Sequence, residues 1–383
     1  MSVVKFSEVA HRANTKEDRF NTDKIYYVGG EHIEPGELFI HDKGFIKGST
    51  IGPMFYCGFK SGQILFVTRN PHLRKCSVAE FDGICSEKTF VIETIDERIL
   101  LQEYLASVML SDDFWNYCEE NKSGGVNYFL NWSTLADYEF ELPSVEEQKA
   151  ISDKVWAAYR LKESYKKLLA ATEEMVKSQF IEMFGNPLSS IQKNELKKLG
   201  DCCQINPRRP SVSISDSDLV SFVPMPAVNE DGYIDGATNE EYGKVKKGFT
   251  YFENNDVLFA KITPCMENGK GAIAEALTNG IGMGSTEFHV LRPIEGISNP
   301  YWLLTLTRMP IFRECAAKNM SGTGGQRRVG AAFLENFMIG LPSISEQETF
   351  ETIYRQADKS EFELRKSIDA IDQVIKSLIN NIK

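Results

Sequence analysis

The sequence lacks the features that mark a membrane protein, a zinc protein or a secreted protein. No apolar run reaches the roughly 18 residues that a membrane span requires. The first residues, MSVVKFSEVAHRANTKED, contain no apolar signal core. The eight cysteines form no Cys-x-x-Cys pair and the five histidines are scattered, so neither a zinc site nor a disulfide framework is indicated. We therefore expect a cytoplasmic protein whose cysteines are reduced core residues.

Motifs of catalysis are also absent, although three short stretches superficially resemble them. ENGKG lacks both the leading glycine and the hydroxyl residue of a phosphate-binding loop. NPYW shares two residues with the Asn-Pro-Pro-Tyr loop of adenine methyltransferases, but helix capping by Asn299 before Pro300 explains it better. EEQK (146–149) has a Glu-x-Lys spacing, yet it opens a helix, where the dipole favours glutamates. We predict no catalytic residue, no metal site and no cofactor in this chain.

Length and charge indicate several domains and no general affinity for polyanions. The 383 residues exceed one typical core, and the content of 42% apolar and 25% charged residues is that of a globular protein. The formal net charge is −11. Residues 1–141 carry 14 Lys/Arg against 22 Asp/Glu, whereas residues 188–340 carry 16 against 17. A nucleic-acid contact would therefore need a local basic surface or a basic partner subunit.

The chain contains an internal duplication. LPSVEEQKAI begins at Leu142, and LPSISEQETF begins 199 positions later, at Leu341. GQILFVTRNP (62–71) parallels NDVLFAKITP (255–264) at an offset of 193. The offset is kept within each half and grows from 193 to 199, which indicates one duplicated unit with a small insertion. Two copies are too few for a solenoid, which would repeat more than twice.

Each copy shows the same order of elements. Short β-branched and aromatic runs such as KIYYVGG and KTFVIE, broken by glycine and proline, predict strands and turns. One helix is expected near the end of each copy, over 96–120 and over 299–319. A glycine-rich loop, a short strand and a Leu-Pro-Ser turn then close the copy.

A long helix follows each copy and carries an apolar stripe. In the first helix, from Glu146 to about Phe184, the stripe comprises Ile151, Val155, Ala158, Leu161, Tyr165, Leu168, Thr172, Met175 and Gln179. In the second helix it comprises Leu364, Ile368, Ile371, Ile375, Leu378 and Ile382. These spacings are typical of a coiled-coil seam, and FGNP (184–187) should end the first helix. We expect the two helices to pair antiparallel; the alternative is that each packs only on its own globular neighbour.

This layout closely resembles the specificity subunits of type I restriction-modification systems. The resemblance covers essentially the whole chain and is carried by LPSVEEQKAI, LPSISEQETF and DVLFAKITPCMENGKGAIA. It implies target recognition domains at 1–143 and 188–342, and conserved long helices at 144–187 and 343–383. The implied fold class is α+β: two pseudo-twofold-related α/β target recognition domains separated by an antiparallel pair of long helices.

The resemblance also implies a non-catalytic subunit that reads a bipartite, asymmetric DNA target, one half-site per domain. Its implied partners are double-stranded DNA, two methyltransferase subunits and restriction motor-nuclease subunits, without a membrane. S-adenosylmethionine, ATP and Mg2+ would belong to those partners. Two alternatives stay open: a module of a modification-only or type IIB-like system, and a duplicated protein-interaction scaffold that reads no DNA, which the acidic balance favours.

Polar residues in loops after strands are the candidates for DNA contact, because such side chains can hydrogen-bond base edges or phosphates. In the second copy they are Lys261, Thr263, Glu267, Asn268, Lys270, Gln326, Arg327 and Arg328, with Arg208 and Arg209 in NPRRP. In the first copy they are Arg69, Asn70, Arg74 and Lys75, with Asn127 in a loop that also offers Lys122 and Tyr128. A tight turn, a glycine hinge or solvated charge is the structural alternative for each set. The first copy reads TRNPHLRK where the second reads KITPCMENGK, so the residues of one cannot be assigned from the other.

Overall fold

The computed structural model describes residues 2–185, 195–211, 213–323 and 325–382. Its contacts divide the chain into unit 1, residues 1–168 with 364–383, and unit 2, residues 169–363. The expected boundary between residues 187 and 188 lies outside the described residues. Among those that are described, no helix is both long and apolar enough to cross a bilayer.

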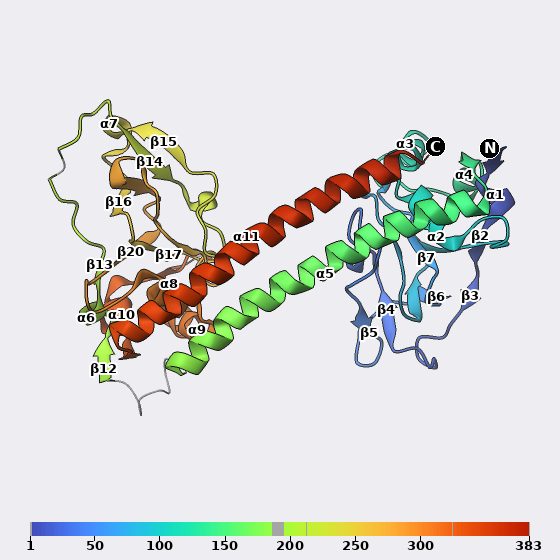
Figure 1. The fold of residues 1–383 in the computed structure, drawn as a ribbon. Helices are drawn as coiled ribbons and strands as arrows, with labels where there is room; N and C mark the ends of the chain where they lie inside the picture. The colour runs from blue at the N-terminus through green and yellow to red at the C-terminus, as the bar shows by residue number, and fades with distance from the viewer. Residues whose placement is uncertain (1, 186–194, 212, 324, 383) are drawn as a thin grey trace. The chain divides into compact units, whose positions relative to one another are not determined.

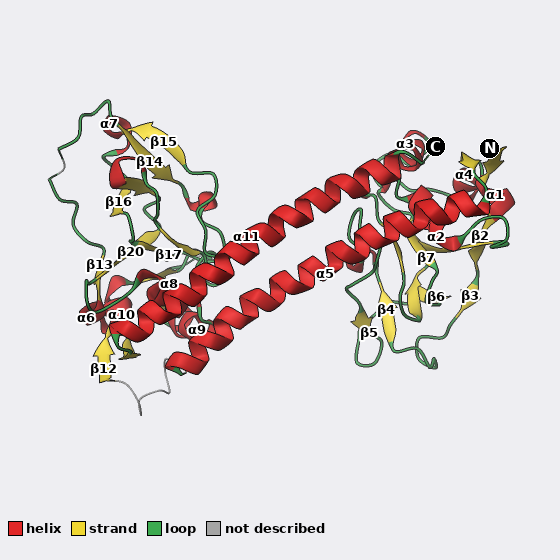
Figure 2. Cartoon of the chain, in the orientation of Figure 1, coloured by secondary structure: helices red, strands yellow, loops and turns green. Residues whose placement is uncertain are grey.

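Unit 1 combines short helices with antiparallel and mixed sheets (Figures 1 and 2). Strand β1 (Ser2–Lys5) pairs with β11 (Glu139–Leu142). A second sheet has the order β2 (Ala10–Ala13), β10 (Thr89–Thr94), β7 (Ile64–Val67), β8 (Cys76–Val78). A third has the order β3 (Thr15–Lys16), β6 (Phe55–Phe59), β9 (Gly83–Ser86), β4 (Tyr26–Val28), β5 (Gly44–Phe45). The short helices are α1 (Phe6–Val9), α2 (Gln102–Met109), α3 (Asp112–Glu120) and α4 (Trp132–Ala136), with 3-10 turns at Gly30–His32 and Pro71–Leu73.

Unit 2 is built in the same way. Strand β12 (Glu195–Lys198) pairs with β23 (Met338–Leu341), and β21 (Met320–Ser321) pairs with β22 (Arg328–Val329). One sheet has the order β13 (Cys203–Ile205), β20 (Phe288–Pro293), β17 (Val257–Ala260), β18 (Gly271–Ile273). Another has the order β15 (Thr238–Glu241), β14 (Leu219–Val223), β19 (Ile281–Gly284), β16 (Thr250–Glu253). The short helices are α6 (Leu199–Cys202), α7 (Tyr242–Val245), α8 (Pro300–Arg308), α9 (Pro310–Lys318) and α10 (Ala331–Asn336), with 3-10 turns at Met225–Ala227 and Thr278–Gly280.

The sheet topology of unit 1 recurs in unit 2. The antiparallel sheet β2-β10-β7-β8 corresponds to β13-β20-β17-β18. The run β6-β9-β4-β5 corresponds to β16-β19-β14-β15, and in both the inner pair, β4 with β9 and β14 with β19, is parallel. Strand β3 is an additional edge strand of unit 1. The duplication inferred from sequence offsets is therefore a duplication of fold.

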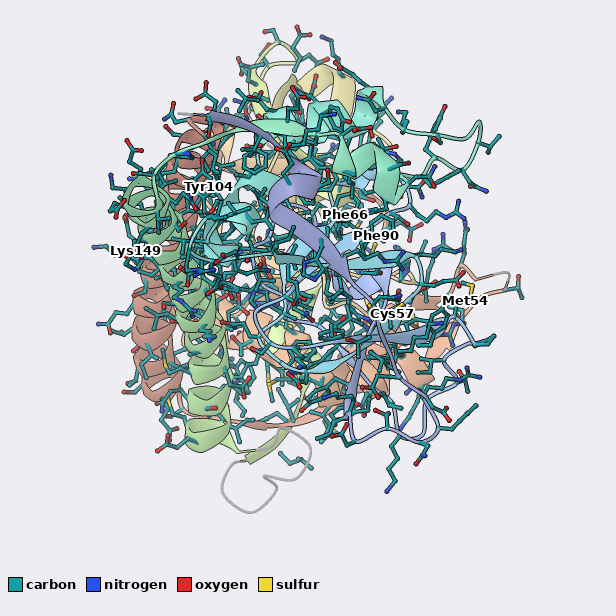
Figure 3. All side chains as sticks on the ribbon, turned by 90° about the vertical axis from the view of Figure 1, so that its right-hand side faces the viewer. Met54, Cys57, Phe66, Phe90, Tyr104 and Lys149 are labelled. Carbon is teal, nitrogen blue, oxygen red and sulfur yellow. The ribbon has the colours of Figure 1, made fainter. Side chains whose placement is uncertain are left out.

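Aromatic side chains fill the core of unit 1 between its sheets and helices. Phe66 of β7 stacks on Phe90 of β10 and on Trp115 of α3, with ring centroids 6.4 and 5.5 Å apart. Figure 3 shows Phe66 and Phe90 in the interior, whereas Lys149 projects from a helix at the surface. Burying one such aromatic side chain stabilises the fold by about 1.5–3 kcal/mol.

The single helices expected over 96–120 and 299–319 are each two helices, so this prediction was wrong in both copies. Ser111 accepts a hydrogen bond from the Phe114 amide and thereby begins α3. Pro310 begins α9 because it has no N–H to continue α8. The expected cap at Asn299 is confirmed, since its side chain accepts a hydrogen bond of 2.9 Å from the Tyr301 amide.

The long helices are α5 (Val145–Phe184) and α11 (Ile344–Asn380), of 40 and 37 residues. In unit 1, Val155 and Tyr159 of α5 share a core with Ile375 of α11. In unit 2, Phe180 of α5 lies 5.3 Å from Phe350 of α11 between ring centroids. The first half of each helix therefore meets the last half of the other, which confirms antiparallel pairing and the predicted α+β fold class. Helix α5 ends at Phe184, and the positive φ of 74° at the following Gly185 is typical of a helix terminus.

The predicted apolar stripe is correct for α11 but only partly correct for α5, where Val155 is buried and Ile151 and Ala158 pack against the core of unit 1. None of the six residues assigned in α11 is exposed. In α5, however, Leu161, Leu168 and Met175 are 45%, 51% and 40% exposed. The buried positions are Gln148, Ser152, Val155, Tyr159, Lys162, Val176, Phe180 and Phe184. The buried face of α5 contains a glutamine and a lysine, Gln148 and Lys162. A prediction that follows apolar residues alone skips these two positions and includes Leu161, Leu168 and Met175, which lie on the neighbouring face.

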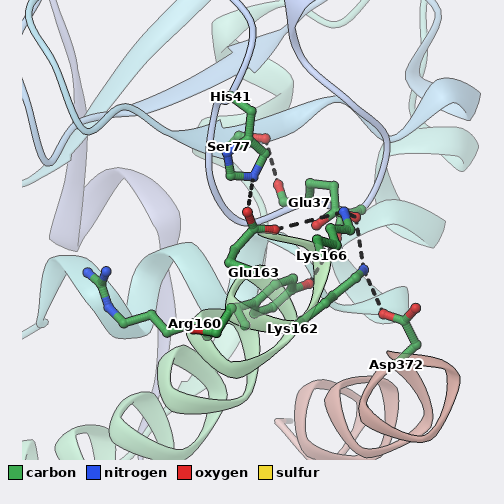
Figure 4. Close-up of polar contacts among 11 residues, drawn as sticks. Glu37, His41, Ser77, Arg160, Lys162, Glu163, Lys166 and Asp372 are labelled. Carbon is green, nitrogen blue, oxygen red and sulfur yellow. Dashed lines mark hydrogen bonds and ion pairs between the residues drawn. The ribbon is translucent and has the colours of Figure 1, made fainter. Parts of the chain in front are cut away.

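Lys162 can occupy the seam because carboxylates surround its ammonium group (Figure 4). Its Nζ lies 2.8 Å from Glu37 Oε1 and 2.6 Å from Asp372 Oδ1. Lys166 Nζ lies 3.0 Å from the same Glu37 oxygen. Burial acts to raise the pKa of Glu37, but hydrogen bonds from the two lysines outweigh it and lower that pKa below its usual value. This network, which we call the Lys162 network, joins a loop of unit 1 to both long helices.

The repeated Leu-Pro-Ser motif first serves as a helix cap. Ser144 donates from its amide and its hydroxyl to Glu147 Oε2, each over 3.0 Å, and accepts from the Glu147 amide at 3.3 Å. Ser343 and Glu346 form the same reciprocal set at 2.9, 2.7 and 3.3 Å. This is a capping box, which satisfies amides that the start of a helix leaves unpaired.

The glutamine that ends the motif fastens each long helix to its unit. Gln148 donates to the carbonyls of Ile99 and Pro143 and accepts from the Leu101 amide, at 2.8, 3.0 and 2.9 Å. Gln347 makes the equivalent bonds to the carbonyls of Ile297 and Pro342 and from the Asn299 amide, at 3.0, 3.0 and 2.9 Å. Both glutamines are 0% exposed. The ten-residue repeat therefore forms the same buried set of hydrogen bonds at the start of both long helices.

Candidate nucleic-acid interface

Two loops of unit 2, each predicted from the sequence to contact DNA, lie side by side in the structure. The Val329 amide donates to the Lys261 carbonyl over 2.9 Å, and the Thr263 amide donates to the Arg327 carbonyl over 3.0 Å. The Thr263 hydroxyl donates to the Gly325 carbonyl over 2.6 Å and accepts from the Arg327 amide at 3.1 Å. We call residues 261–270 and 325–329 together platform 2.

The arginines of platform 2 are paired with glutamates. Arg327 Nη2 lies 2.9 Å from Glu267 Oε1. Arg328 holds both oxygens of Glu287 through Nε and Nη2, at 2.9 and 2.8 Å. This hydrogen bonding from Arg328 lowers the pKa of Glu287 below its usual value, so the carboxylate is charged at neutral pH. The two guanidinium groups are thus oriented by carboxylates, which suits base readout better than nonspecific attraction to phosphates.

Amide side chains complete the surface of platform 2. Asn268 and Gln326 are both exposed. Asn268 Nδ2 donates to Glu230 Oε1 over 2.8 Å, which fixes the orientation of the amide. Lys261 and Lys270 are half-buried, and their side chains form no hydrogen bond or ion pair with any described residue. Platform 2 therefore presents amides, lysines and paired arginines together.

Unit 1 has the same backbone arrangement. The Leu130 amide donates to the Thr68 carbonyl, and the Asn70 amide donates to the Tyr128 carbonyl, each over 2.9 Å. An isolated β-bridge joins Arg69 to Phe129, as one joins Ile262 to Arg328 in unit 2. We call residues 68–75 and 123–130 together platform 1. Its positions correspond to those of platform 2 at offsets of 193 in the first loop and 199 in the second.

The side chains of platform 1 differ from those of platform 2. The Arg69 guanidinium lies over the Phe129 ring, 5.2 Å from its centroid, in the place of Ile262 and Arg328. Lys122 Nζ lies 4.4 Å from the Tyr128 ring centroid and 2.6 Å from Glu119 Oε2. Asn127 is exposed. Platform 1 thus sets Arg69 against an aromatic ring where platform 2 sets its arginines against glutamates.

The remaining candidates in unit 1 face the protein. Arg74 forms an ion pair with Asp112 at the start of α3. Lys75 Nζ donates to the Gly30 carbonyl over 2.5 Å. Both residues are half-buried, so their present contacts hold the loop of platform 1 in place.

The NPRRP loop of unit 2 bonds through Asn206 to His289 and Val290 of β20, and through Arg209 to the residue that follows α7. Arg209 Nη1 donates to the Lys246 carbonyl over 2.6 Å, and its guanidinium lies 5.9 Å from the Tyr242 ring centroid. Arg208 is exposed and forms no hydrogen bond or ion pair with the part of the chain that the structure describes. The Arg208 side chain thus has all its donors available for a DNA contact, whereas one donor of Arg209 is bonded to the protein.

Sequence reasoning missed Phe129, Glu230 and Glu287. Phe129 could have been found, because the offset of 199 aligns it with the nominated Arg328. The two glutamates carry no such signal, since Glu287 lies 41 residues from Arg328 and Glu230 lies 38 residues from Asn268. Contacts of this range depend on the tertiary fold alone.

No group of three or more metal-ligating side chains occurs among the described residues. All eight cysteines are free thiols, and six of them are buried. Their environment is that of core residues, as the sequence suggested.

Comparison with solved structures defines the class of fold. The S subunit of a type I restriction-modification system from M. genitalium matches with a TM-score of 0.61 at 12% identity, covering 100% of this chain and 95% of that one. A chain from a structure described as the basis of complex assembly and conformational transition of the type I R-M system matches with a TM-score of 0.56 at 18% identity, covering 100% and 97%. The fold is therefore that of type I specificity subunits.

Sequence comparison finds similar proteins of the same kind. Residues 191–372 match the model of the type I restriction modification DNA specificity domain. The type I restriction enzyme EcoAI specificity subunit of Escherichia coli is 36% identical over 238 residues, which cover 57% of this chain and 39% of that protein. Over these residues the chain is similar to type I restriction-modification DNA specificity proteins. It spans only 39% of the length of the curated relatives it matches.

Proposed function

We propose that this chain is a non-catalytic subunit that reads a bipartite, asymmetric sequence in double-stranded DNA. Unit 1 reads one half-site through platform 1, and unit 2 reads the other through platform 2. The observation that carries the proposal is that the two platforms share their backbone hydrogen bonds but differ in their exposed side chains. A common frame with different donors and acceptors is what two unlike half-sites require.

The chemistry of the platforms supports base contact despite the net charge of −11. Arg69, held over an aromatic ring, and Arg328, held by both oxygens of a carboxylate, are oriented donors suited to guanine. Asn70, Asn127, Asn268 and Gln326 offer amides suited to adenine. Affinity for the phosphate backbone would then come mainly from partner subunits.

The long helices are the proposed docking surface for those partners. Leu161 and Leu168 of α5 are 45% and 51% exposed, although each is a large apolar residue on a long helix. Two methyltransferase subunits, with restriction motor-nuclease subunits in a full system, are the proposed occupants. S-adenosylmethionine, and ATP with Mg2+ where a motor is present, would be bound by those subunits in the cytoplasm.

Sequencing of methylated adenines, with and without the gene, tests the proposal. We expect one split adenine motif with two unlike halves to be methylated in the parent strain and unmethylated in the deletion strain. An identical set of methylated motifs in the two strains would leave a protein-interaction scaffold as the better account.

A further inference from the structure

A cavity of about 230 Å³ borders platform 2 on its inner side, within unit 2. Asn268 and Gly269 of the platform line it on one side, and Arg308 and Arg313 of α8 and α9 line it on another. Tyr354 of α11 also contributes to the wall. The cavity thus lies where the reading loop, the α8–α9 pair and a long helix meet.

The two arginines direct their donors at main-chain carbonyls and not at carboxylates. Arg313 Nη1 donates to the Glu267 carbonyl over 2.8 Å, and Arg308 Nη2 donates to the Glu230 carbonyl. Neither guanidinium forms an ion pair with a described residue. Each Nε is buried and has no hydrogen-bond partner among those residues. A buried Nε donor left without a partner is costly, which indicates that the carbonyl contacts serve a purpose.

Both carbonyl contacts lead directly to side chains of platform 2. Glu267, whose carbonyl Arg313 holds, orients Arg327 through a carboxylate contact of 2.9 Å. Glu230, whose carbonyl Arg308 holds, accepts the hydrogen bond from Asn268 at 2.8 Å. Each of these half-buried arginines therefore contacts a residue whose side chain pairs with an exposed polar group of the platform.

Gly269 supplies a separate sign that the loop is shaped around Arg313. Its φ is +80°, a conformation that side chains other than glycine rarely adopt. A Cβ added there would lie 3.0 Å from Arg313 Nη1. The close approach of the guanidinium to the backbone thus depends on glycine at this position.

Unit 1 also has a contact between its reading loop and the corresponding helix, but there it is an ion pair. There the platform residue Arg74 reaches Asp112 of α3, the helix that corresponds to α9. The Asp112 carboxylate also accepts from Asn380 Nδ2 of α11 at 2.8 Å. In both units, then, an ionic group connects the corresponding helix to the corresponding reading loop.

We propose that Arg308 and Arg313 are positioning residues for one half-site: they hold residues 267–269 and Glu230 so that Asn268 and Arg327 meet their bases in register. The inference rests on the proposed function of platform 2. The arginines touch no DNA. Their loss leaves the reading side chains present but variably placed, so discrimination at the bases they read falls while the other half-site stays intact.

The test uses chromosomal alleles of the full chain carrying Arg313→Met, Arg308→Met or Arg313→Lys, read by sequencing of methylated adenines. Arg355→Met is the control, because Arg355 is an arginine of unit 2 that is 54% exposed, forms ion pairs with Glu275 and Glu351, and lies 4.5 Å from the Tyr301 ring centroid. For the two Met variants we expect discrimination at one or two positions of one half-site to fall roughly tenfold, the value of about one good base contact. Arg313→Lys keeps one cationic donor and should restore most of that discrimination. The control should retain the parent motif.

Melting temperatures of the purified variants separate positioning from mere stability. If Arg313→Met reduces methylation equally at all sites, in step with a lower melting temperature, and Arg313→Lys keeps the parent motif, the arginines are structural and the inference is overturned. An unchanged motif in both Met variants overturns it equally. If the parent allele itself directs no methylated motif, the proposed function fails, and the inference fails with it for that distinct reason.

Discussion

Replacing Lys162 with methionine should destabilise unit 1 because it leaves buried Glu37 with one cation in place of two. Removing one member of a buried ion pair usually costs about 3–5 kcal/mol. Here the cost should be near 3 kcal/mol, since Lys166 remains 3.0 Å from Glu37 and the Asp372 side chain, 43% exposed, can be hydrated. Urea unfolding of the full chain, followed in unit 1 by hydrogen exchange, measures the change.

A double-mutant cycle with Glu37→Gln isolates the interaction. We expect a coupling of about 2 kcal/mol between the two positions, as for residues in one buried network. Lys149→Met is the control, because Lys149 and Asp153 form an exposed pair at 3.3 Å that should contribute less than about 0.5 kcal/mol. Additive effects, or a loss for Lys162→Met no greater than for Lys149→Met, would refute the role assigned to the Lys162 network.

The same network predicts a pH dependence. Hydrogen bonds from Lys162 and Lys166 lower the pKa of Glu37 in the folded chain below its ordinary value of 4.5, against the opposing effect of burial. The stabilisation is therefore present above the unfolded-state pKa and is lost as pH falls below it through the folded-state pKa. The parent chain should lose more stability than Glu37→Gln when the pH is lowered from 6 towards about 3. Parallel losses in the two proteins would contradict this.

Three further predictions concern the long helices. Gln148→Ala and Gln347→Ala should each destabilise their own unit by about 1–3 kcal/mol, because each leaves an amide and carbonyls unpaired; denaturant unfolding resolved by unit checks this, and a loss in one only would contradict the equivalence of the two sets of hydrogen bonds. Leu161→Asp should leave the melting temperature within a few degrees of the parent but weaken copurification with methyltransferase subunits, whereas unaltered copurification would argue against that surface. One added heptad in α5 with the facing heptad in α11 lengthens the pair by about 10 Å, or about three base pairs, so the unread spacer of the methylated motif should lengthen accordingly; an unchanged spacer would contradict spacing by the helices.

Much of the fold could be predicted because duplication and helix periodicity are local properties of the sequence. The offsets between the copies anticipated the repeated sheets, and the stripe ending at Ile382 anticipated the buried face of α11. The register of α5 could not be read in this way. Its seam contains Lys162, which is buried only because Glu37 and Asp372, 125 residues before it and 210 after it, converge on it.

In the candidate site, too, some features could be predicted from the local sequence and others depend on the tertiary fold. The loops containing Thr263 and Arg327 could be nominated from composition, but their contact could not, since 64 residues separate the partners. The pairing of Arg328 with Glu287 likewise depends on the fold, since 41 residues separate the two. The offset of 199 between the copies aligns Phe129 with Arg328, so the sequence could have identified Phe129 as a candidate residue of the first copy.

The most direct test of the central claim, that each unit reads its own half-site, is sequencing of methylated adenines in strains that carry platform variants. One allele combines Arg69→Ala with Asn70→Ala, and the other combines Gln326→Ala with Arg328→Ala. We predict that the first allele changes the bases accepted in one half of the motif only, and that the second changes the other half only. Altered specificity in the same half for both alleles, or in neither, would contradict the claim.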